Sequence, residues 1–235
     1  MNILNIKSTQ IIKYVDYIIY GFVNIAIIVQ FILAYLFLVD NKKRFQYLNH
    51  SFDLFNNLVY TKYSVTEGIL ASSIPNYINI NNDTGKDEYI SNSKINLENQ
   101  RKDFTEIYSY FSNPSIRLPK EYINFIASSN IKIKTINNGI QTEEIQPLSV
   151  AINRMTNSIF YVSTMSSKEN FDMSNKYVYE LMVNILNGHY KSFEKIIFIF
   201  LEDFLSTTKD SLLKNIFIFV ISILISCLCL FFIGE

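Results

Sequence analysis

The sequence predicts a mainly α-helical fold in which two transmembrane helices flank an extracytosolic helical bundle, with room for one short β-hairpin. Two observations support this fold class. Two apolar segments without a charged residue, 17–39 and 216–233, lie near the two ends of the chain. Between them, apolar residues recur at the three- and four-residue steps of helices that bury one face. We therefore divide the chain into an N-terminal tail (1–16), a first span, a polar middle (40–215), a second span and a short stub (234–235).

Each apolar segment is close to the roughly 20 residues that an α-helix needs to cross about 30 Å of hydrocarbon. A segment surrounded by lipid must satisfy its own backbone polar groups, so both are expected to be helical. The first is longer than the apolar part of a signal peptide, and Asp40 to Arg44 follow it without a small-residue cleavage site. We expect a multi-pass protein whose partners are the lipid bilayer and other membrane protein chains or a second copy of itself.

The orientation of the polar middle is left open by the residues alone. Lys42, Lys43 and Arg44 directly follow the first span and favour a cytosolic middle, although this rule is weak for long translocated domains. Asn49 and Asn82 each begin an N-glycosylation triplet, which fits a lumenal middle. The sequence does not indicate which membrane would hold the chain.

Four polar residues within the spans are candidates for contacts inside the membrane. The amides are Asn24 and Gln30 in the first span, and the hydroxyls are Ser222 and Ser226 in the second. In hydrocarbon such groups seek partners, so they could join the two spans or neighbouring chains at about 1 kcal/mol per contact. An alternative of equal weight is that these four residues are simply tolerated in the spans and form no such contacts.

The composition excludes several functional classes. The chain has 21 basic and 21 acidic side chains, so no charge excess points to nucleic acid. Its two histidines, His50 and His189, lack metal-ligand spacing, and both cysteines, Cys227 and Cys229, lie in the second span. The sequence also lacks a glycine-rich phosphate loop, a nucleophile elbow and a paired-cysteine redox motif. We expect no catalytic, metal or cofactor site and therefore no enzyme.

The first half of the middle predicts two helices separated by a loop. A stripe of apolar residues predicts a helix over 43–71, which should end before Pro75. Asn, Asp, Gly and Ser crowd the stretch 76–93 and predict a loop. A second stripe predicts a helix over 94–112, and Pro114 stops it.

The period then changes in a way that favours a hairpin. Apolar or threonine residues alternate with lysine over 131–135, and an Asn-Asn-Gly turn ending at Gly139 follows. The return strand is poorly marked. Thr142 instead predicts the N-cap of a new helix, with Glu143 and Glu144 in its first turn near the positive helix end.

The last helix has the most regular pattern in the chain. No proline follows Asn175, so a helix could run directly into the second span as a rod of roughly 90 Å. Gly188 is its one weak point and a possible bend. Alternating steps of four and three residues predict a heptad seam for packing, formed by Tyr179, Val183, Leu186, Tyr190, Phe193, Ile197, Phe200 and Phe204.

The run from Tyr177 to Leu230 resembles the extracytosolic region of the TmcB-like transmembrane proteins of ciliates. The resemblance is carried by Asn184-Ile185-Leu186-Asn187, Tyr190, Leu205-Ser206 and the final span, with Val183 where the family pattern has tyrosine. It covers about the last 90 residues, where 146–162 is similar to the preceding helix of those proteins. It implies an extracytosolic middle and a sensory or structural role in a membrane. Those proteins often carry PAS sensory modules, for which this sequence shows no counterpart.

Two functions are consistent with these features. The first is a receptor-like or sensor-like protein whose ligand is unknown. The sequence leaves only two residues after the second span for a cytosolic effector, so such a protein would need a partner or be a fragment of a longer gene product. The second is a structural or accessory subunit of a membrane complex, docked through the seam and the polar span residues.

Overall fold

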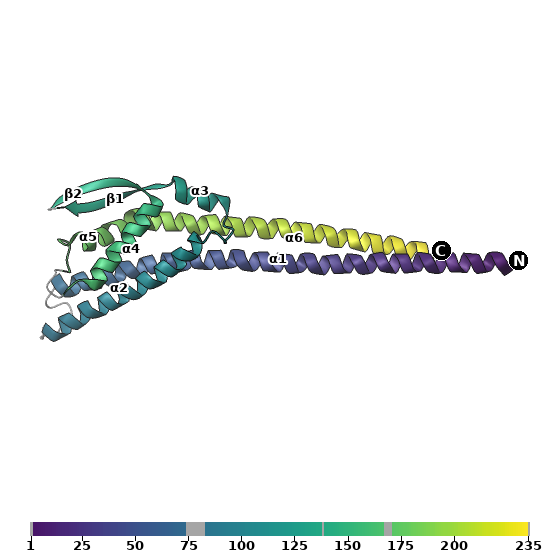
Figure 1. The fold of residues 1–235 in the computed structure, drawn as a ribbon, viewed down its shortest axis with the longest axis horizontal. Helices are drawn as coiled ribbons and strands as arrows, with labels where there is room; N and C mark the ends of the chain where they lie inside the picture. Colours follow the sequence, from purple (N-terminus) through teal and green to yellow (C-terminus); the bar gives the residue numbers. More distant parts are fainter. Residues whose placement is uncertain (1, 74–82, 138, 167–170, 235) are drawn as a thin grey trace. The chain divides into compact units, whose positions relative to one another are not determined.

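The computed structural model describes residues 2–73, 83–137, 139–166 and 171–234. It confirms a mainly helical fold with one small two-stranded antiparallel sheet (Figure 1). The elements follow one another as α1 (Asn2–Ser73), α2 (Asp83–Ser112), α3 (Lys120–Ser128), β1 (Asn130–Asn137), β2 (Ile140–Pro147), α4 (Leu148–Thr164), α5 (Lys176–Asn184), the π-helical turn η1 (Ile185–His189) and α6 (Tyr190–Gly234).

The chain divides into two compact units. The first, which we call the paired-helix unit, consists of Met1–Gln46 and Asp203–Glu235. The second, the folded unit, consists of Tyr47–Glu202. Helices α1 and α6 contribute residues to both units.

Side-chain contacts join the two helices of the paired-helix unit. The hydroxyl of Thr208 donates to the side-chain oxygen of Asn41 at 3.0 Å. The ring centroids of Phe45 and Phe204 lie 6.2 Å apart. Arg44 forms ion pairs with Asp203 of α6 and with Asp40, one turn earlier on α1. Asn41 faces Thr208, and Phe45 faces Phe204. Residue numbers thus increase along α1 as those of the facing residues decrease along α6, so the two helices are antiparallel.

One helix in the part of the chain that the structure describes is long and apolar enough to cross a membrane. It lies within Tyr17–Ser73 of α1, and none of its most apolar stretch is buried. This finding rests on length and composition alone.

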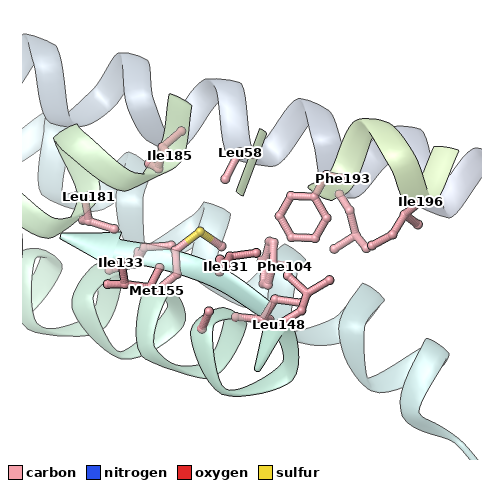
Figure 2. Close-up of a cluster of buried hydrophobic side chains, with 14 of the residues drawn as sticks. Leu58, Phe104, Ile131, Ile133, Leu148, Met155, Leu181, Ile185, Phe193 and Ile196 are labelled. Atoms are coloured by element: carbon pink, nitrogen blue, oxygen red, sulfur yellow. The ribbon is translucent and has the colours of Figure 1, made fainter. Parts of the chain in front are cut away.

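The folded unit has a single core built from one face of each helix and from β1. Strand β1 supplies Ile131 and Ile133, whose side chains lie among residues from α4 and α5 in Figure 2. Burial of apolar side chains from several elements in one cluster supplies most of the stability of such a unit. The largest fully buried side chains include Leu54, Leu58, Leu97, Phe104, Leu148, Ile152, Ile159, Leu181, Ile185, Phe193 and Phe200.

The predicted hairpin is present, and its return strand, which the sequence marks poorly, is β2. Strand β1 buries Ile131, Ile133 and Thr135 and exposes the intervening lysines. Pairing extends from Asn137 opposite Ile140 to Asn130 opposite Pro147. Gly139 has φ of 80°, a conformation in the tight turn that other residues rarely adopt.

The helix predicted to begin at Thr142 is wrong, because residues 140–147 form β2 and α4 begins at Leu148. Glu143 and Glu144 do not lie in a helical first turn. Glu143 pairs with Lys132 at 2.9 Å and Glu144 with Arg154 at 2.8 Å. Backbone pairing with β1 and these charges outweighed the local helix-start signal.

The loop predicted over 76–93 is also wrong for residues 83–93, since α2 begins at Asp83. Residues 76–82 of that prediction lie outside the described residues. Ser93 and Leu97 are buried, and Ile90 packs against the core. Tertiary packing of one face therefore overrides a composition that favours loops.

The last helix is continuous from Lys176 to Gly234 except for the π-helical turn η1, which contains Gly188. A side chain at Gly188 would place its Cβ only 3.3 Å from the carbonyl oxygen of Lys132. The missing side chain lets the turn approach β1 closely, and the helix adapts there by accommodating an extra residue.

Gly68 offers a test of packing in the folded unit. A Cβ at this position would overlap the ring of Phe171, which is 3% exposed. We expect Gly68→Ala to lower the free energy of unfolding by about 1–3 kcal/mol, because overpacking outweighs a gain of about 1 kcal/mol in helix propensity. Denaturant unfolding in detergent, followed by circular dichroism, measures the change.

Gly21→Ala is the matched control on the same helix, since no atom lies within 4 Å of its added Cβ. It should not destabilise the protein. Equal stabilities for the two variants would contradict the packing of Phe171 against Gly68.

Candidate functional site: a buried arginine–glutamate cluster and its groove

Asn184, at the end of α5, holds this helix against the free edge of β1. Its side-chain oxygen accepts the backbone N–H of Lys134 at 2.7 Å, and its Nδ2 donates to the Lys134 carbonyl at 2.7 Å. The same Nδ2 donates to the carbonyl of Glu180 at 2.9 Å. The amide thus replaces a third strand, satisfying two backbone groups that would otherwise lack partners.

Glu180 of α5 is a buried carboxylate, 5% exposed, and four donors surround it. Arg154 of α4 donates from Nη2 at 2.6 Å and from Nε at 3.2 Å, a two-pronged contact. Thr135 of β1 donates its hydroxyl at 2.6 Å, and Ser158 of α4 donates at 3.1 Å. One carboxylate therefore ties β1, α4 and α5 together.

The charges of this cluster are held in their ionised forms. Burial alone would raise the pKa of Glu180, but the hydrogen bonds from Arg154 and Thr135 hold it below its ordinary value. Its own hydrogen bonds to Glu180 keep the pKa of Arg154 raised, and the hydrogen bond that it donates to Glu144 on the solvent side raises it further. An ionised, fully bonded carboxylate is a poor proton donor or acceptor near neutral pH.

A groove of about 500 Å³ opens directly outside this cluster. Arg154, Ser158 and Glu180 form its inner wall, while two exposed asparagines of α4, Asn153 and Asn157, lie along it one turn apart. The remaining lining residues come from β1, β2, α4 and α5, and they are Asn137, Glu144, Val150, Tyr161, Lys176 and Tyr177. Val150 is the one aliphatic residue of this lining, although polar and apolar atoms share the surface about equally.

Two tyrosines form one side of the groove. The rings of Tyr161 on α4 and Tyr177 on α5 are stacked, with centroids 4.3 Å apart and planes inclined by 17°. Burial raises the pKa of Tyr177, so its hydroxyl stays neutral at ordinary pH. The stacked rings join the last turn of α4 to the first turn of α5. Glu180 joins the same two helices in the interior.

A second, much smaller cavity lies on the inner side of the cluster. It measures about 10 Å³, room for about one water molecule, and both Glu180 and Asn184 line it. His189 of η1 also lines it, and its Nδ1 forms no hydrogen bond with the described residues. Complete burial lowers the pKa of His189 to about 4, so the ring is neutral at pH 7.

The eight residues of the predicted seam fall into three groups of burial. Tyr179, Phe193 and Phe200 are buried, while Leu186, which lies in η1, is 55% exposed. A π-helical turn uses more residues per turn than an α-helix, so a seven-residue pattern shifts its face on crossing it. The other four, Val183, Tyr190, Ile197 and Phe204, are partly buried.

Aromatic contacts show what the seam residues of the folded unit touch. Tyr190 contacts Phe55 of α1 at 4.8 Å between ring centroids, and Phe193 contacts Phe104 of α2 at 5.7 Å. Phe200 lies 5.0–6.0 Å from aromatic rings of three other helices. In the folded unit these seam residues therefore contact other elements of the same chain.

The polar residues predicted to form contacts within the spans differ in burial. Asn24 is exposed, whereas Gln30 is partly buried in a groove between α1 and α6 of the paired-helix unit. Ser222 is partly buried, and the side chain of Ser226 lies outside the described ones. Across that groove from Gln30 lies Asn215, which the sequence analysis did not select.

Sequence analysis also missed Glu180 and Arg154, although a signal for both exists. Glu180 is the only charged residue between Tyr177 and Gly188, a stretch that is otherwise mostly apolar. Arg154 is the only basic residue in the segment from 135 to 167. A single charge on a helix face expected to be buried needs a partner of opposite charge.

Comparisons with known proteins and the search for metal ligands add no further site. No protein-family model, curated protein or solved structure matches this chain. Among the described residues, no three histidine, cysteine, aspartate or glutamate side chains gather as metal ligands would. The cluster around Glu180 forms a polar wall beside the groove.

Replacing Glu180 tests the energetic importance of the cluster. Glu180→Ala leaves the Arg154 guanidinium and two buried hydroxyls without their acceptor, so we expect a loss of about 3 kcal/mol or more in the free energy of unfolding. Glu144→Ala is the matched control, because it removes the other carboxylate on Arg154 from a half-exposed position. Its cost should be below about 1 kcal/mol in urea unfolding experiments. Similar losses for both variants would refute the special role of Glu180.

The buried imidazole predicts a specific dependence of stability on pH. The pKa of His189 is about 4 when folded and about 6.5 when unfolded, so its contribution is fully present above pH 6.5. It is lost as the pH falls through about 4 and amounts to about 3 kcal/mol. Urea unfolding at pH 7, 5.5 and 4.5 should show a smaller decline for His189→Phe than for the wild type. Parallel declines would contradict a neutral buried His189.

Proposed function

We propose that this chain is a two-span integral membrane protein, with spans at 17–39 and 216–233, that acts as a receptor-like or sensor-like protein. Its folded unit would lie outside the cytosol and bind a ligand in the groove beside Glu180. The groove is the observation that carries this proposal, because it combines about 500 Å³ of space with a convergent set of polar side chains. The resemblance of residues 177–230 to TmcB-like proteins supports an extracytosolic folded unit.

The lining of the groove favours a neutral, polar ligand. Its two cations, Arg154 and Lys176, are balanced by its two carboxylates, Glu144 and Glu180. The amides of Asn153 and Asn157 are exposed and supply both donors and acceptors. Hydroxyl-rich or amide-bearing small molecules meet these groups without carrying an unpaired charge into the site.

The elements around the groove suggest how binding would be transmitted. The groove lies between α4, α5 and β1, and α5 continues through η1 into α6. A ligand that preferred one arrangement of α4 relative to α5 would shift the population of that arrangement. Helix α6 contains the second apolar segment, so a partner in the membrane would receive the change.

Thermal unfolding in lipid nanodiscs with a panel of neutral sugars, free amino acids and nucleosides tests this proposal. A compound that binds at 100 times its Kd should stabilise the folded unit by about 2.7 kcal/mol. Asn157→Leu, in the groove, should reduce the shift in melting temperature by more than half. Asn124→Leu changes an exposed amide of α3 away from the groove and should leave the shift intact.

A different outcome would favour the alternative function. If no compound shifts the melting temperature and the chain purifies with stoichiometric membrane proteins, it is a structural or accessory subunit. Orientation is tested separately by translation into microsomes, where Asn82 should be glycosylated and Asn82→Gln should remove the modification. Protection of the folded unit from glycosylation and from lumenal protease would overturn its extracytosolic location.

A further inference from the structure

A further groove of the folded unit lies where β1 meets η1 and the start of α6. It has a volume of about 490 Å³. Three lysines from two elements line it, so we call it the lysine groove. Its lining residues are Asn130, Ile131, Lys132, Lys134, Glu143, Asn187, Gly188, Lys191 and Ser192. None of these residues lines the groove beside Glu180.

The lysine groove carries an excess of positive charge. Its lining contains three ammonium groups and a single carboxylate, that of Glu143. Glu143 pairs with Lys132 at 2.9 Å, and neither Lys134 nor Lys191 has an ion-pair partner among the described residues. The whole chain has equal numbers of basic and acidic side chains, so this surplus is a local feature. A concave surface lined by one sign of charge concentrates ions of the opposite sign.

The backbone edge of β1 adds a neutral donor at the wall of this groove. The N–H of Lys134 donates to Asn184 and therefore points away from β2. In an antiparallel ladder, residues two positions apart direct their backbone groups to the same edge. The N–H of Lys132 thus also points away from β2, toward the side where Gly188 lies against the Lys132 carbonyl.

These donors favour a phosphate group over a single carboxylate. A phosphate monoester carries about −1.5 to −2 charges at pH 7 and three acceptor oxygens, so one group can neutralise two ammonium groups at once. Lysine binds phosphate as a point charge, whereas the planar fork of arginine matches a carboxylate. None of the described lining residues is an arginine. The exposed amide of Asn130 supplies hydrogen bonds for a neutral part of the ligand.

We propose that the lysine groove binds a phosphate group, either as inorganic phosphate or as the monoester of a small polar molecule. Lys134 and Lys191 hold the phosphate, and Lys132 lies beside them. Because these lysines come from β1 and α6, a bound phosphate ties the hairpin to the start of the last helix. The site lies within the folded unit, so it depends neither on the membrane spans nor on the ligand of the groove beside Glu180.

Isothermal titration calorimetry of the full chain in a maltoside detergent tests the proposal without phosphate from lipids. The probes are inorganic phosphate and glycerol 3-phosphate, at an ionic strength held constant with sodium chloride. At least one probe should bind in a one-to-one ratio, and tighter binding of glycerol 3-phosphate identifies a monoester site. Lys134→Gln and Lys191→Gln should each weaken binding about fivefold or more, because each removes a charge that contacts the phosphate.

Two further variants separate a specific site from general attraction of anions. Lys120→Gln removes the same charge from an exposed position of α3 outside the groove and should leave the affinity unchanged. Glu143→Gln removes the competing carboxylate and releases Lys132, so it should tighten binding about two- to fivefold.

Three results would overturn the proposal. The wild type could bind neither probe saturably, Lys120→Gln could lose as much affinity as Lys191→Gln does, or Glu143→Gln could bind more weakly than the wild type. Since the three lysines and Glu143 are exposed, melting temperatures measured without phosphate should be similar for all variants.

Discussion

The buried ion pair between Glu180 and Arg154 is the interaction on which the folded unit depends. A carboxylate that is 5% exposed stays ionised only because charge-assisted and neutral donors surround it. Those donors come from β1 and α4, while the carboxylate comes from α5. The hairpin has only two strands, and such a hairpin is marginal without support. The hydrogen bonds of Thr135 and of the Asn184 amide therefore support it in addition to its own pairing.

The same requirement explains the π-helical turn that follows. Asn184 must reach both backbone groups of Lys134, and Gly188 lies against the carbonyl of Lys132 two residues earlier on β1. An α-helix that passes so close to a strand must leave space for it, and a glycine within a wider turn does so. His189 is then carried into the interior, where its ring is buried and neutral at pH 7. The π-helical turn, the support of β1 by Asn184 and the lowered pKa of His189 thus all follow from the contact between the end of α5 and β1.

Elements with a strong period could be predicted from the sequence, and those specified by long-range partners could not. The alternation over 131–135 predicted which residues of β1 face the core, and the stripes over 43–71 and 94–112 predicted helical segments within α1 and α2. By contrast, the residues of β2 are mostly exposed, so its sequence does not alternate between buried and exposed positions. Only its pairing with β1 defines this strand. The candidate site was missed for a similar reason. Glu180 and Arg154 lie 26 residues apart, and no local rule joins them.

Polar groups in apolar surroundings mark both candidate sites, but with opposite balances. Around Glu180 the acceptors and donors are matched within the chain, so the cluster forms one wall of the groove that we propose as a ligand site. In the groove of the paired-helix unit, the Nε2 of Gln30 has no match among the described residues. A satisfied network stabilises the chain by itself, whereas an unsatisfied donor gains free energy only when something else binds. That difference is why the first site explains how the fold is held together, whereas the second leaves a hydrogen-bond donor without a partner among the described residues.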